Sequence, residues 1–410
     1  MEILYKRCCG IDVHAKNVVC CLLSPDLPKG KEIKTFSTMT DDLLALADWL
    51  TQGGCTHVAM ESTGVYWKPV FNILEGLMEV ILVNAQHIKK VPGRKTDVSD
   101  CQWIAELLQL GLLKGSFIPP KEIRELRELT RYRKTLIRQR AEQINRIQKL
   151  LENANIKLGQ VATDVMGASG RAMLKAIVKG ESDPEKLANL AEARLRNKMA
   201  ELKKALKGKV SESQRFLLSE ELFLIEQIEA SIERCNKQIR EQIAPFSQSM
   251  QILDQIPGVA QKTAEVIISE IGVDMSRFPT DRHISSWAGM CPGNNESAGK
   301  RKSGKTNAGN PWLKAALTEA AWAASRSKDS YLQAQFQRLV RSKGKKKALV
   351  AVGHSILVIV YHLLAKQTSY QDLGHNYFLK RNKGAEQKRL IRKLEALDLK
   401  VTVEPLEKAA

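Results

Sequence analysis

The chain has 410 residues with a hydrophobic share of 43%, which is enough for two or three domains that each bury a core. Its 64 lysines and arginines outnumber 45 acidic residues, and the formal charge of +19 suits a polyanionic partner such as nucleic acid. No segment resembles a signal peptide, and the longest apolar run, residues 348–365, is too short for a membrane span, so we expect a cytoplasmic protein with no membrane partner.

The N-terminal segment predicts an α/β domain with a mixed sheet. Residues 9–16 form a short apolar run that is broken by Asp12 and followed by a polar turn, and residues 17–23 read as the returning strand. Further strands are expected at 33–37, 56–60 and 80–83, with helices at 41–50 and 65–77. Several of the eight cysteines lie in these strands and none forms a C-x-x-C pair, which predicts buried free thiols.

Two carboxylates occupy unusual places in this pattern. Asp12 interrupts the first apolar run, and Glu61 ends the run at 56–60. If these two strands are neighbours, their backbones lie about 4.8 Å apart and both carboxylates share one edge of the sheet. An ionised group near a buried strand end loses hydration, which has a cost. Taken singly, Asp12 is better explained as a turn aspartate that closes a hairpin.

Asp97 and Asp100 follow the basic loop 84–94 at an expected helix start. Thr96 or Asp97 can serve as the N-cap, and the i, i+3 spacing places both aspartates on one helical face. Capping and the helix dipole account for either aspartate singly. This pair alone therefore leaves the structural and the functional explanations open.

Two long helices are predicted in the middle of the chain, at 121–152 and 213–243, with short helices at 167–206 between them. The first carries a densely basic outer face, which suits either a solvated surface or phosphate contact. The second has the 3/4 apolar repeat of a coiled coil. The two helices can pair antiparallel into an arm or pair with another subunit, and the sequence does not choose between these arrangements.

Residues 252–272 resemble a helix-hairpin-helix, in which a glycine turn and the free N–H groups of the next helix receive a DNA phosphate. Gly258 and Lys262 would make this contact, although Ala260 stands where a second glycine is common. A helical hairpin used only for packing is the rival explanation. The remaining helices are expected at 312–325, 331–343 and 348–366, the last one buried and followed by a basic tail.

The stretch 289–311 is rich in glycine, asparagine and lysine, so we expect an exposed loop that can mould itself to phosphates. Residues 299–306 within it fit the pattern of a nucleotide-binding P-loop. That motif requires a strand directly before it and a helix that begins at its lysine, whereas here residues 307–311 delay the helix. We interpret the match as accidental.

Together these motifs resemble the DEDD-type insertion-sequence transposases, which are serine-dependent, RuvC-like DNA recombinases, guided in some members by a bridge RNA. The likeness covers nearly the whole chain in the family's order. The matching segments are 10–14, 60–67, 95–100, 167–171, 256–272, 296–300 and 309–310. Each segment alone is a weak signal, but their combination is specific.

The resemblance implies an RNase H-like N-terminal domain whose four carboxylates are catalytic and hold a divalent metal, Mg²⁺ or Mn²⁺. These carboxylates are Asp12, Glu61, Asp97 and Asp100. Four acids at one edge repel one another unless a cation compensates them, and hard oxygen ligands favour these two ions over zinc.

The same resemblance implies that Ser297 is the nucleophile and forms a covalent phosphoserine link with DNA. Basic residues of its loop would neutralise the nearby backbone. These residues are Lys300, Arg301, Lys302 and Lys305. A Holliday-junction resolvase-like nuclease would use the same acids with water as the nucleophile. An architectural nucleic-acid-binding protein would keep the acids as structural residues and would not cleave DNA.

We also expect four regions along the chain. They are a catalytic domain at 1–155, whose last helix at 121–153 is shared with the arm, a helical linker and coiled coil at 156–248, a transposase domain with the helix-hairpin-helix and serine loop at 249–345, and a core helix with a basic tail at 346–410. The expected partners are DNA, a non-coding guide RNA and further copies of the chain in a dimer or tetramer. The expected setting is the prokaryotic cytoplasm, in association with the nucleoid.

Overall fold

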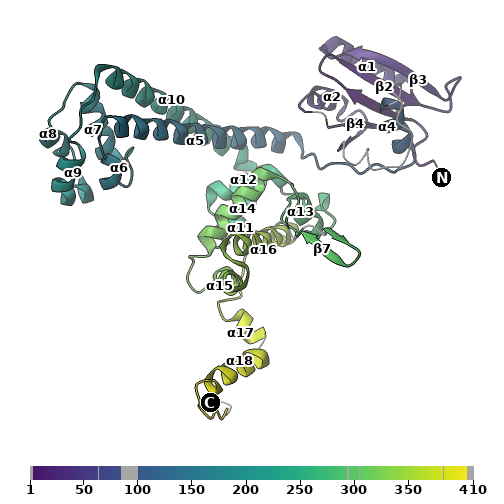
Figure 1. Cartoon of the computed structure of the whole chain (residues 1–410). Coiled ribbons are helices and arrows are strands. Elements are labelled where there is room, and N and C mark those ends of the chain that lie inside the picture. Colours follow the sequence, from purple (N-terminus) through teal and green to yellow (C-terminus); the bar gives the residue numbers. More distant parts are fainter. Residues whose placement is uncertain are drawn as a thin grey trace. The chain divides into compact units, whose positions relative to one another are not determined.

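The computed structural model describes residues 3–62, 64–84, 100–292, 295–303, 305–381 and 383–403. The chain divides into two units, residues 1–118 and 119–410. The first unit is mixed α/β and the second is almost wholly helical (Figure 1). This confirms the predicted combination of an N-terminal α/β region with a largely helical remainder, whereas the finer four-part division stays a prediction.

A five-stranded sheet with the order β3-β2-β1-β4-β5 organises the N-terminal unit. Its strands are β1 (Cys8–Val13), β2 (Asn17–Leu23), β3 (Lys31–Ser37), β4 (His57–Glu61) and β5 (Glu79–Val83). β2 pairs antiparallel with both β1 and β3, whereas β4 pairs parallel with both β1 and β5. The central strand β1 is buried on both faces, which explains why its sequence is a nearly continuous apolar run.

Helices cover both faces of this sheet. α1 (Thr40–Gln52) and α2 (Trp67–Leu74) share a core with one set of alternate β1 residues, and α4 (Asp100–Gln109) packs against the other set. The backbones of β1 and α4 come unusually close at Gly10, where a Cβ atom would lie 2.1 Å from the carbonyl oxygen of Cys101. Only glycine fits at this position, and it fixes how near α4 comes to the strand.

The prediction of buried free thiols is confirmed. None of the eight cysteines forms a disulfide, and all except the partly exposed Cys291 are buried. Burial raises the pKa of Cys8, Cys21 and Cys55 to about 12. Such thiols stay protonated at neutral pH and are poor nucleophiles.

The two longest helices of the C-terminal unit pair antiparallel into an arm (Figure 1). These helices are α5 (Lys121–Asn153) and α10 (Glu212–Ile243). Their direction follows from the ion pairs that join them, because Arg140 meets Glu229 whereas Arg146 meets Glu221. The apolar repeat of α10 is therefore used within one chain, which is one of the two arrangements that the sequence left open.

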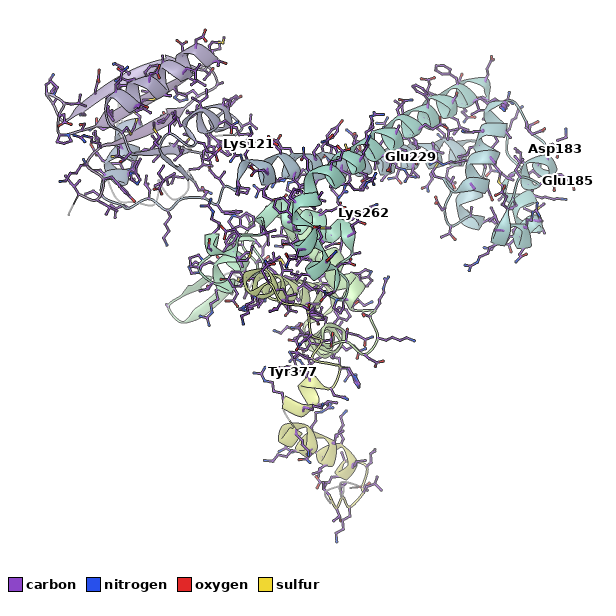
Figure 2. The ribbon with its side chains drawn as sticks, turned by 180° about the vertical axis from the view of Figure 1, so that it is seen from behind. Lys121, Asp183, Glu185, Glu229, Lys262 and Tyr377 are labelled. Atoms are coloured by element: carbon purple, nitrogen blue, oxygen red, sulfur yellow. The ribbon has the colours of Figure 1, made fainter. Side chains whose placement is uncertain are left out.

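Short helices close the far end of this arm. They are α6 (Leu158–Val161), α7 (Ala168–Val178), α8 (Pro184–Ala188), a 3₁₀ turn at Ala193–Lys198 and α9 (Met199–Ala205). Asp183 caps α8 by accepting a hydrogen bond from the backbone N–H of Glu185 (Figure 2). Buried side chains of α7 and α9 form one hydrophobic core with Leu218 and Leu222 of α10.

A helical bundle with one small hairpin follows the arm. Its elements are a 3₁₀ turn at Ala244–Phe246, α11 (Ser247–Asp254), α12 (Gln261–Ile271), a 3₁₀ turn at Met275–Arg277, α13 (Asp281–Trp287), β6 (Asn295–Ser297), β7 (Lys300–Ser303), α14 (Pro311–Ala324), α15 (Tyr331–Lys343), α16 (Lys345–Lys366), α17 (Tyr377–Arg381) and α18 (Lys383–Glu395). Among the described helices, α16 alone is long and apolar enough to cross a membrane. It packs against α13, α14 and α15 as the core helix that the sequence predicts.

Candidate active site

Asp12 and Glu61 lie at the same edge of the sheet. β1 and β4 are parallel neighbours whose last paired residues are Ile11 and Met60, so each acid follows directly after that pair. The side chain of Asp12 is 21% exposed, and its Oδ2 lies 3.2 Å from Nε2 of His14. Two partly exposed carboxylates on adjacent strand ends match the arrangement that the sequence predicts for this edge.

Asp100 belongs to the helix that packs over the same strand. It is the first residue of α4, directly before Cys101, whose carbonyl oxygen closely approaches Gly10. Asp12 lies two residues beyond Gly10 and therefore on the same face of β1. Burial is the main cause of the raised pKa of the Cys101 thiol, and the neighbouring Cys20 and Asp12 add to it. Asp12, two residues from Gly10, and Asp100, next to Cys101, thus both lie beside the point where α4 approaches β1.

The fourth predicted acid, Asp97, lies outside the described residues. Within the described ranges, no three histidine, cysteine, aspartate or glutamate side chains lie close enough together to hold a metal ion. The candidate acids supply carboxylate oxygen atoms, the ligand type that Mg²⁺ and Mn²⁺ prefer. Asp12, Glu61 and Asp100 therefore fit such an ion in the chemistry of their oxygen atoms, but they do not by themselves form a three-residue metal site in the described part of the chain.

Ser297 lies in a two-stranded hairpin rather than in an irregular loop. β6 and β7 pair antiparallel, with Ser297 opposite Lys300 and a bulge between Asn295 and Glu296. The two residues that join the strands, Ala298 and Gly299, have φ angles of 49° and 72°. Positive φ at both central positions defines a type I′ turn, which matches the twist of the strands that it joins.

This hairpin replaces the mouldable loop that the sequence predicts. Lys300 is exposed beside the turn, and Lys305 is exposed after the second strand. The next helix, α14, begins only at Pro311, with Asn310 as its N-cap. A P-loop would need a helix that begins near Lys305, so the structure supports the interpretation that this match is accidental.

The predicted helix-hairpin-helix packs tightly against α14. Gly258 has a φ angle of 87°, and a Cβ atom there would lie 2.2 Å from the carbonyl oxygen of Ala320. This glycine therefore has a packing role, as the rival explanation expects. Lys262, on the first turn of α12, is exposed (Figure 2). Its contact with a nucleic-acid phosphate stays a prediction.

Many cations of the basic face of α5 are paired with acidic side chains of other helices. Its ion pairs are Arg131 with Glu270, Arg133 with Glu265, Lys134 with Glu319, Arg140 with Glu229 and Arg146 with Glu221. Burial would raise the pKa of Glu229, but the guanidinium groups of Arg171 and Arg140 hold it below its ordinary value. The arginines of α5 thus bind the arm and the bundle together.

Glu265 and Glu270 are the residues that sequence reasoning missed. Both are buried, in a helix whose other residues are mostly apolar. Two acids within an otherwise apolar helix indicate buried ion pairs, since buried carboxylates almost always have charged partners. Burial also lowers the pKa of Arg127 to about 10, while the nearby Glu270 opposes that effect.

Comparison with known proteins decides the family. A transposase family model, of the DEDD type and named after the insertion sequence IS110, matches residues 9–156. A second model, described as the transposase IS116/IS110/IS902 family, matches residues 250–337. The chain belongs to the IS110 family of transposases. The first match contains all four candidate acids and the second contains Ser297, so the resemblance seen in the sequence is confirmed.

Two relatives agree with this family. The transposase for insertion sequence element IS1111A of Coxiella burnetii is 23% identical over 297 residues, which are 71% of this chain and 72% of the relative. An insertion element IS110 uncharacterized 43.6 kDa protein of Streptomyces coelicolor is 28% identical over 122 residues, or 29% of this chain and 30% of the relative. As an IS110-family transposase, the protein is a DNA-processing enzyme.

Proposed function

We propose that this transposase cuts and exchanges DNA strands through a covalent serine–DNA intermediate, with an acidic metal-binding site in an RNase H-like domain. The observation that carries the proposal is the position of Asp12 and Glu61 on neighbouring parallel strand ends, beneath the helix that begins at Asp100. The sheet order, three antiparallel strands continued by two parallel ones, supports the RNase H-like assignment.

Asp12, Glu61, Asp97 and Asp100 would hold the divalent cation, Mg²⁺ or Mn²⁺. When bound, such a cation supplies charge stabilisation to the reacting phosphate and lowers the pKa of a hydroxyl group beside it. Each acid contributes carboxylate oxygens as metal ligands, and the partly exposed side chain of Asp12 remains accessible to solvent. His14, whose imidazole lies against the carboxylate of Asp12, would help to orient that carboxylate.

Ser297 would act as the nucleophile. Its hydroxyl oxygen forms a phosphoester bond, one bridging P–O bond of the DNA breaks, and the proton leaves to the departing oxygen or to solvent. The new ester conserves the free energy of the broken bond for rejoining, which hydrolysis would not. Basic side chains of the same segment would neutralise the DNA backbone around it. These are Lys300, Arg301, Lys302 and Lys305.

We further propose a non-coding guide RNA and a homo-oligomer as partners, in the prokaryotic cytoplasm. The formal charge of +19 supports binding of more than one nucleic-acid segment. Lys262, exposed at the start of α12, and the backbone around Gly258 would contribute to phosphate binding at the helical hairpin. Gel shifts with DNA and with RNA transcribed from the flanks of the gene test whether the protein binds both nucleic acids.

The decisive experiment traps the covalent adduct. Purified protein is incubated with Mg²⁺ or Mn²⁺ and end-labelled DNA from the ends of its element, and covalent species are separated under denaturing conditions. We expect Ser297→Ala and Asp12→Asn to bind DNA but to form no adduct. Ser303→Ala, in the same hairpin, and Asp42→Asn, an exposed acid of α1, are the matched controls and retain it.

The outcome also separates the rival functions. A normal adduct in Ser297→Ala would reject the assignment of the nucleophile. Metal-dependent cleavage by the wild-type protein without any adduct would indicate a resolvase-like nuclease. Loss of folding in Asp12→Asn would indicate that this acid is structural.

A further inference from the structure

We propose that Glu270 is a positioning residue that ties the base of the Ser297 hairpin to helix α5, an inference that rests on the proposed role of Ser297. The contacts that carry this proposal all lie within residues 119–410. They lead from the base of the hairpin to α5.

The base of the hairpin is fixed by contacts between its two ends. Pro292 and Thr306 form a β-bridge, and Nζ of Lys314 donates a hydrogen bond of 2.6 Å to Oγ1 of Thr306. Two glycines then cross in close contact, since a Cβ atom on Gly309 would lie 2.3 Å from the backbone nitrogen of Gly289. The hairpin therefore moves with the start of α14.

Asn310 controls how α14 starts. Its Oδ1 accepts hydrogen bonds from the backbone N–H groups of Trp312 and Leu313, at 3.0 and 3.1 Å. Its Nδ2 donates to Oε2 of Glu270 at 2.6 Å. The bond to Glu270 orients the side-chain amide so that its oxygen faces the helix. The bond to Glu270 therefore reinforces the orientation that the two capping hydrogen bonds require.

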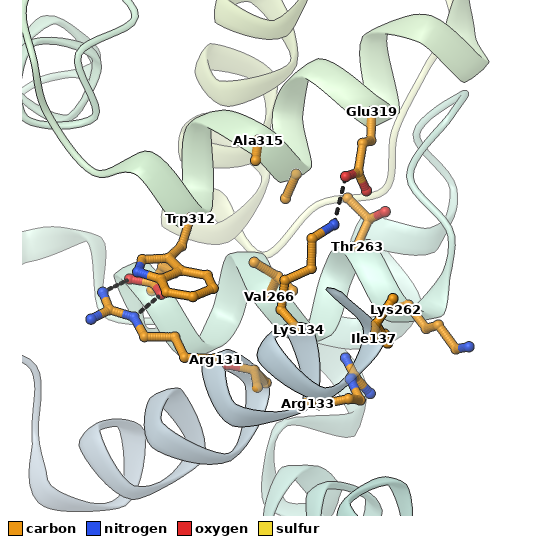
Figure 3. A pocket seen from close by; sticks show the side chains of 13 residues that line it. Arg131, Arg133, Lys134, Ile137, Lys262, Thr263, Val266, Trp312, Ala315 and Glu319 are labelled. Carbon is orange, nitrogen blue, oxygen red and sulfur yellow. Dashed lines mark hydrogen bonds and ion pairs between the residues drawn. The ribbon is translucent and has the colours of Figure 1, made fainter. Parts of the chain in front are cut away.

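Glu270 is itself held by α5. Its side chain is fully buried and accepts two hydrogen bonds of 2.7 Å from Nε and Nη2 of Arg131. Arg127 adds a contact of 3.4 Å to the same carboxylate and donates to the backbone oxygen of Glu270. The guanidinium of Arg131 also lies over the ring of Trp312, 5.6 Å from its centroid (Figure 3). One arginine of α5 thus contacts both the carboxylate and the first turn of α14.

These contacts form a continuous path from α5 through Glu270 and Asn310 to the hairpin base. A shift of α5 along or about its axis would move Arg131, and the fully buried carboxylate leaves little room to absorb that movement. We therefore expect Glu270 to determine the position of Ser297 without touching DNA. The residue acts through others, so its loss should slow adduct formation and leave DNA affinity unchanged.

Glu265 provides a matched control on the same helix. It is also buried and pairs with α5, through Nη1 of Arg133 at 2.5 Å, but its hydrogen bonds among the described residues do not reach the hairpin segment. Glu265→Gln therefore weakens the α5–α12 contact in the same manner as Glu270→Gln. A purely structural role predicts equal effects of the two substitutions on the hairpin, whereas a positioning role predicts different ones.

The experiment uses the full-length protein and two readouts, amide hydrogen exchange at Trp312 and Leu313 and the rate of adduct formation at saturating DNA. In Glu270→Gln, one carboxylate oxygen becomes an NH₂ group that opposes a donor of Arg131 or Asn310. We expect hydrogen exchange at Trp312 and Leu313 to accelerate on the order of tenfold more than exchange in α12 does. The rate of adduct formation should fall by a similar factor. Glu265→Gln should change α12 exchange alone.

A double variant provides a rescue experiment for the bond between Glu270 and Asn310. Asn310→Asp retains the capping oxygen but sets a second carboxylate against Glu270, so we expect the same loss. Combined with Glu270→Gln, it restores a donor–acceptor pair, and most of the adduct rate should return. Equal cap exchange in Glu270→Gln and Glu265→Gln, or no rescue in the double variant, would overturn the inference. A wild-type protein that forms no adduct would refute the role of Ser297, while hydrogen exchange would still test the positioning path.

Discussion

The close approach of α4 to β1 gives a quantitative prediction for Gly10→Ala. The new Cβ would lie 2.1 Å from the carbonyl oxygen of Cys101 and 2.3 Å from the backbone nitrogen of Ala105. Ordinary contacts of a Cβ atom are at about 3.5 Å or more, so α4 must move by more than about 1 Å. Because the obstructing atoms are backbone, no side-chain rotation relieves the clash. Overpacking costs about 1–3 kcal/mol, and we expect a loss of about 3 kcal/mol or more here.

Hydrogen exchange of peptides from β1 and α4 is the suitable assay. Tryptophan fluorescence would mix the two units, since three of the six tryptophans lie in residues 1–118 and three in residues 119–410. Gly115→Ala is the control, because the nearest atom to its new Cβ would be a side-chain methyl group of Ile81, at 3.3 Å, and no backbone atom lies within 4 Å. Exchange in Gly10→Ala no faster than in Gly115→Ala would refute the packing argument.

The same substitution also tests the acidic site. Asp100 begins α4, so a displaced helix carries this acid away from Asp12 on β1. We expect metal-dependent cleavage to be lost under conditions where the N-terminal unit remains folded. Wild-type cleavage by a folded Gly10→Ala protein would show that the position of Asp100 relative to β1 is unimportant.

Three further outcomes follow from burial and charge. Glu265→Gln leaves the buried Arg133 without its carboxylate partner and should lower the free energy of opening of α12 by about 3–5 kcal/mol. Glu319→Gln removes an exposed ion pair and should cost only about 0–1 kcal/mol. Hydrogen exchange measures both effects. A thiol reagent should modify Cys291 first in the native protein and all eight cysteines after denaturation, so rapid labelling of several native thiols would contradict the structure. Burial lowers the pKa of His354 below its ordinary value of 6.5, so the unfolded chain takes up a proton more readily than the folded one. The contribution of this histidine to the free energy of unfolding is therefore fully present above about pH 6.5 and should be lost at lower pH. His354→Gln should reduce that loss in urea titrations at about pH 7 and about pH 5.5.

The N-terminal sheet could be predicted because its physical causes are local. β1, β4 and β5 are short apolar runs bounded by polar turns, and the acids Asp12 and Glu61 stand out against that background. Parallel pairing of β1 with β4 then brings the two strand ends together without further information. The distance between α4 and β1 was harder to predict from the sequence, because a single residue of β1, Gly10, sets it.

The hairpin that contains Ser297 could not be predicted from hydrophobic periodicity. β6 reads Asn-Glu-Ser and β7 reads Lys-Arg-Lys-Ser, so neither strand has an apolar face. Its turn uses Ala298 at a positive φ angle, where asparagine, aspartate or glycine is the usual signal. The hairpin is positioned by backbone pairing and by the close approach of Gly289 and Gly309. Neither contact produces a hydrophobic periodicity in the sequence.

The contacts of α5 show why a charge run in a sequence does not locate a nucleic-acid surface. Arg131 and Arg133 meet acids of α12 that are more than 130 residues away along the chain. These arginines carry positive charge that is compensated inside the protein, so the excess of +19 must come mainly from other positions. One such group is exposed at the junction of α15 and α16, where Arg341, Lys343 and residues 345–347 have no ion pair among those described. Phosphate binding depends on uncompensated cations, and it is therefore to be sought at sites like this junction rather than at the paired arginines of α5.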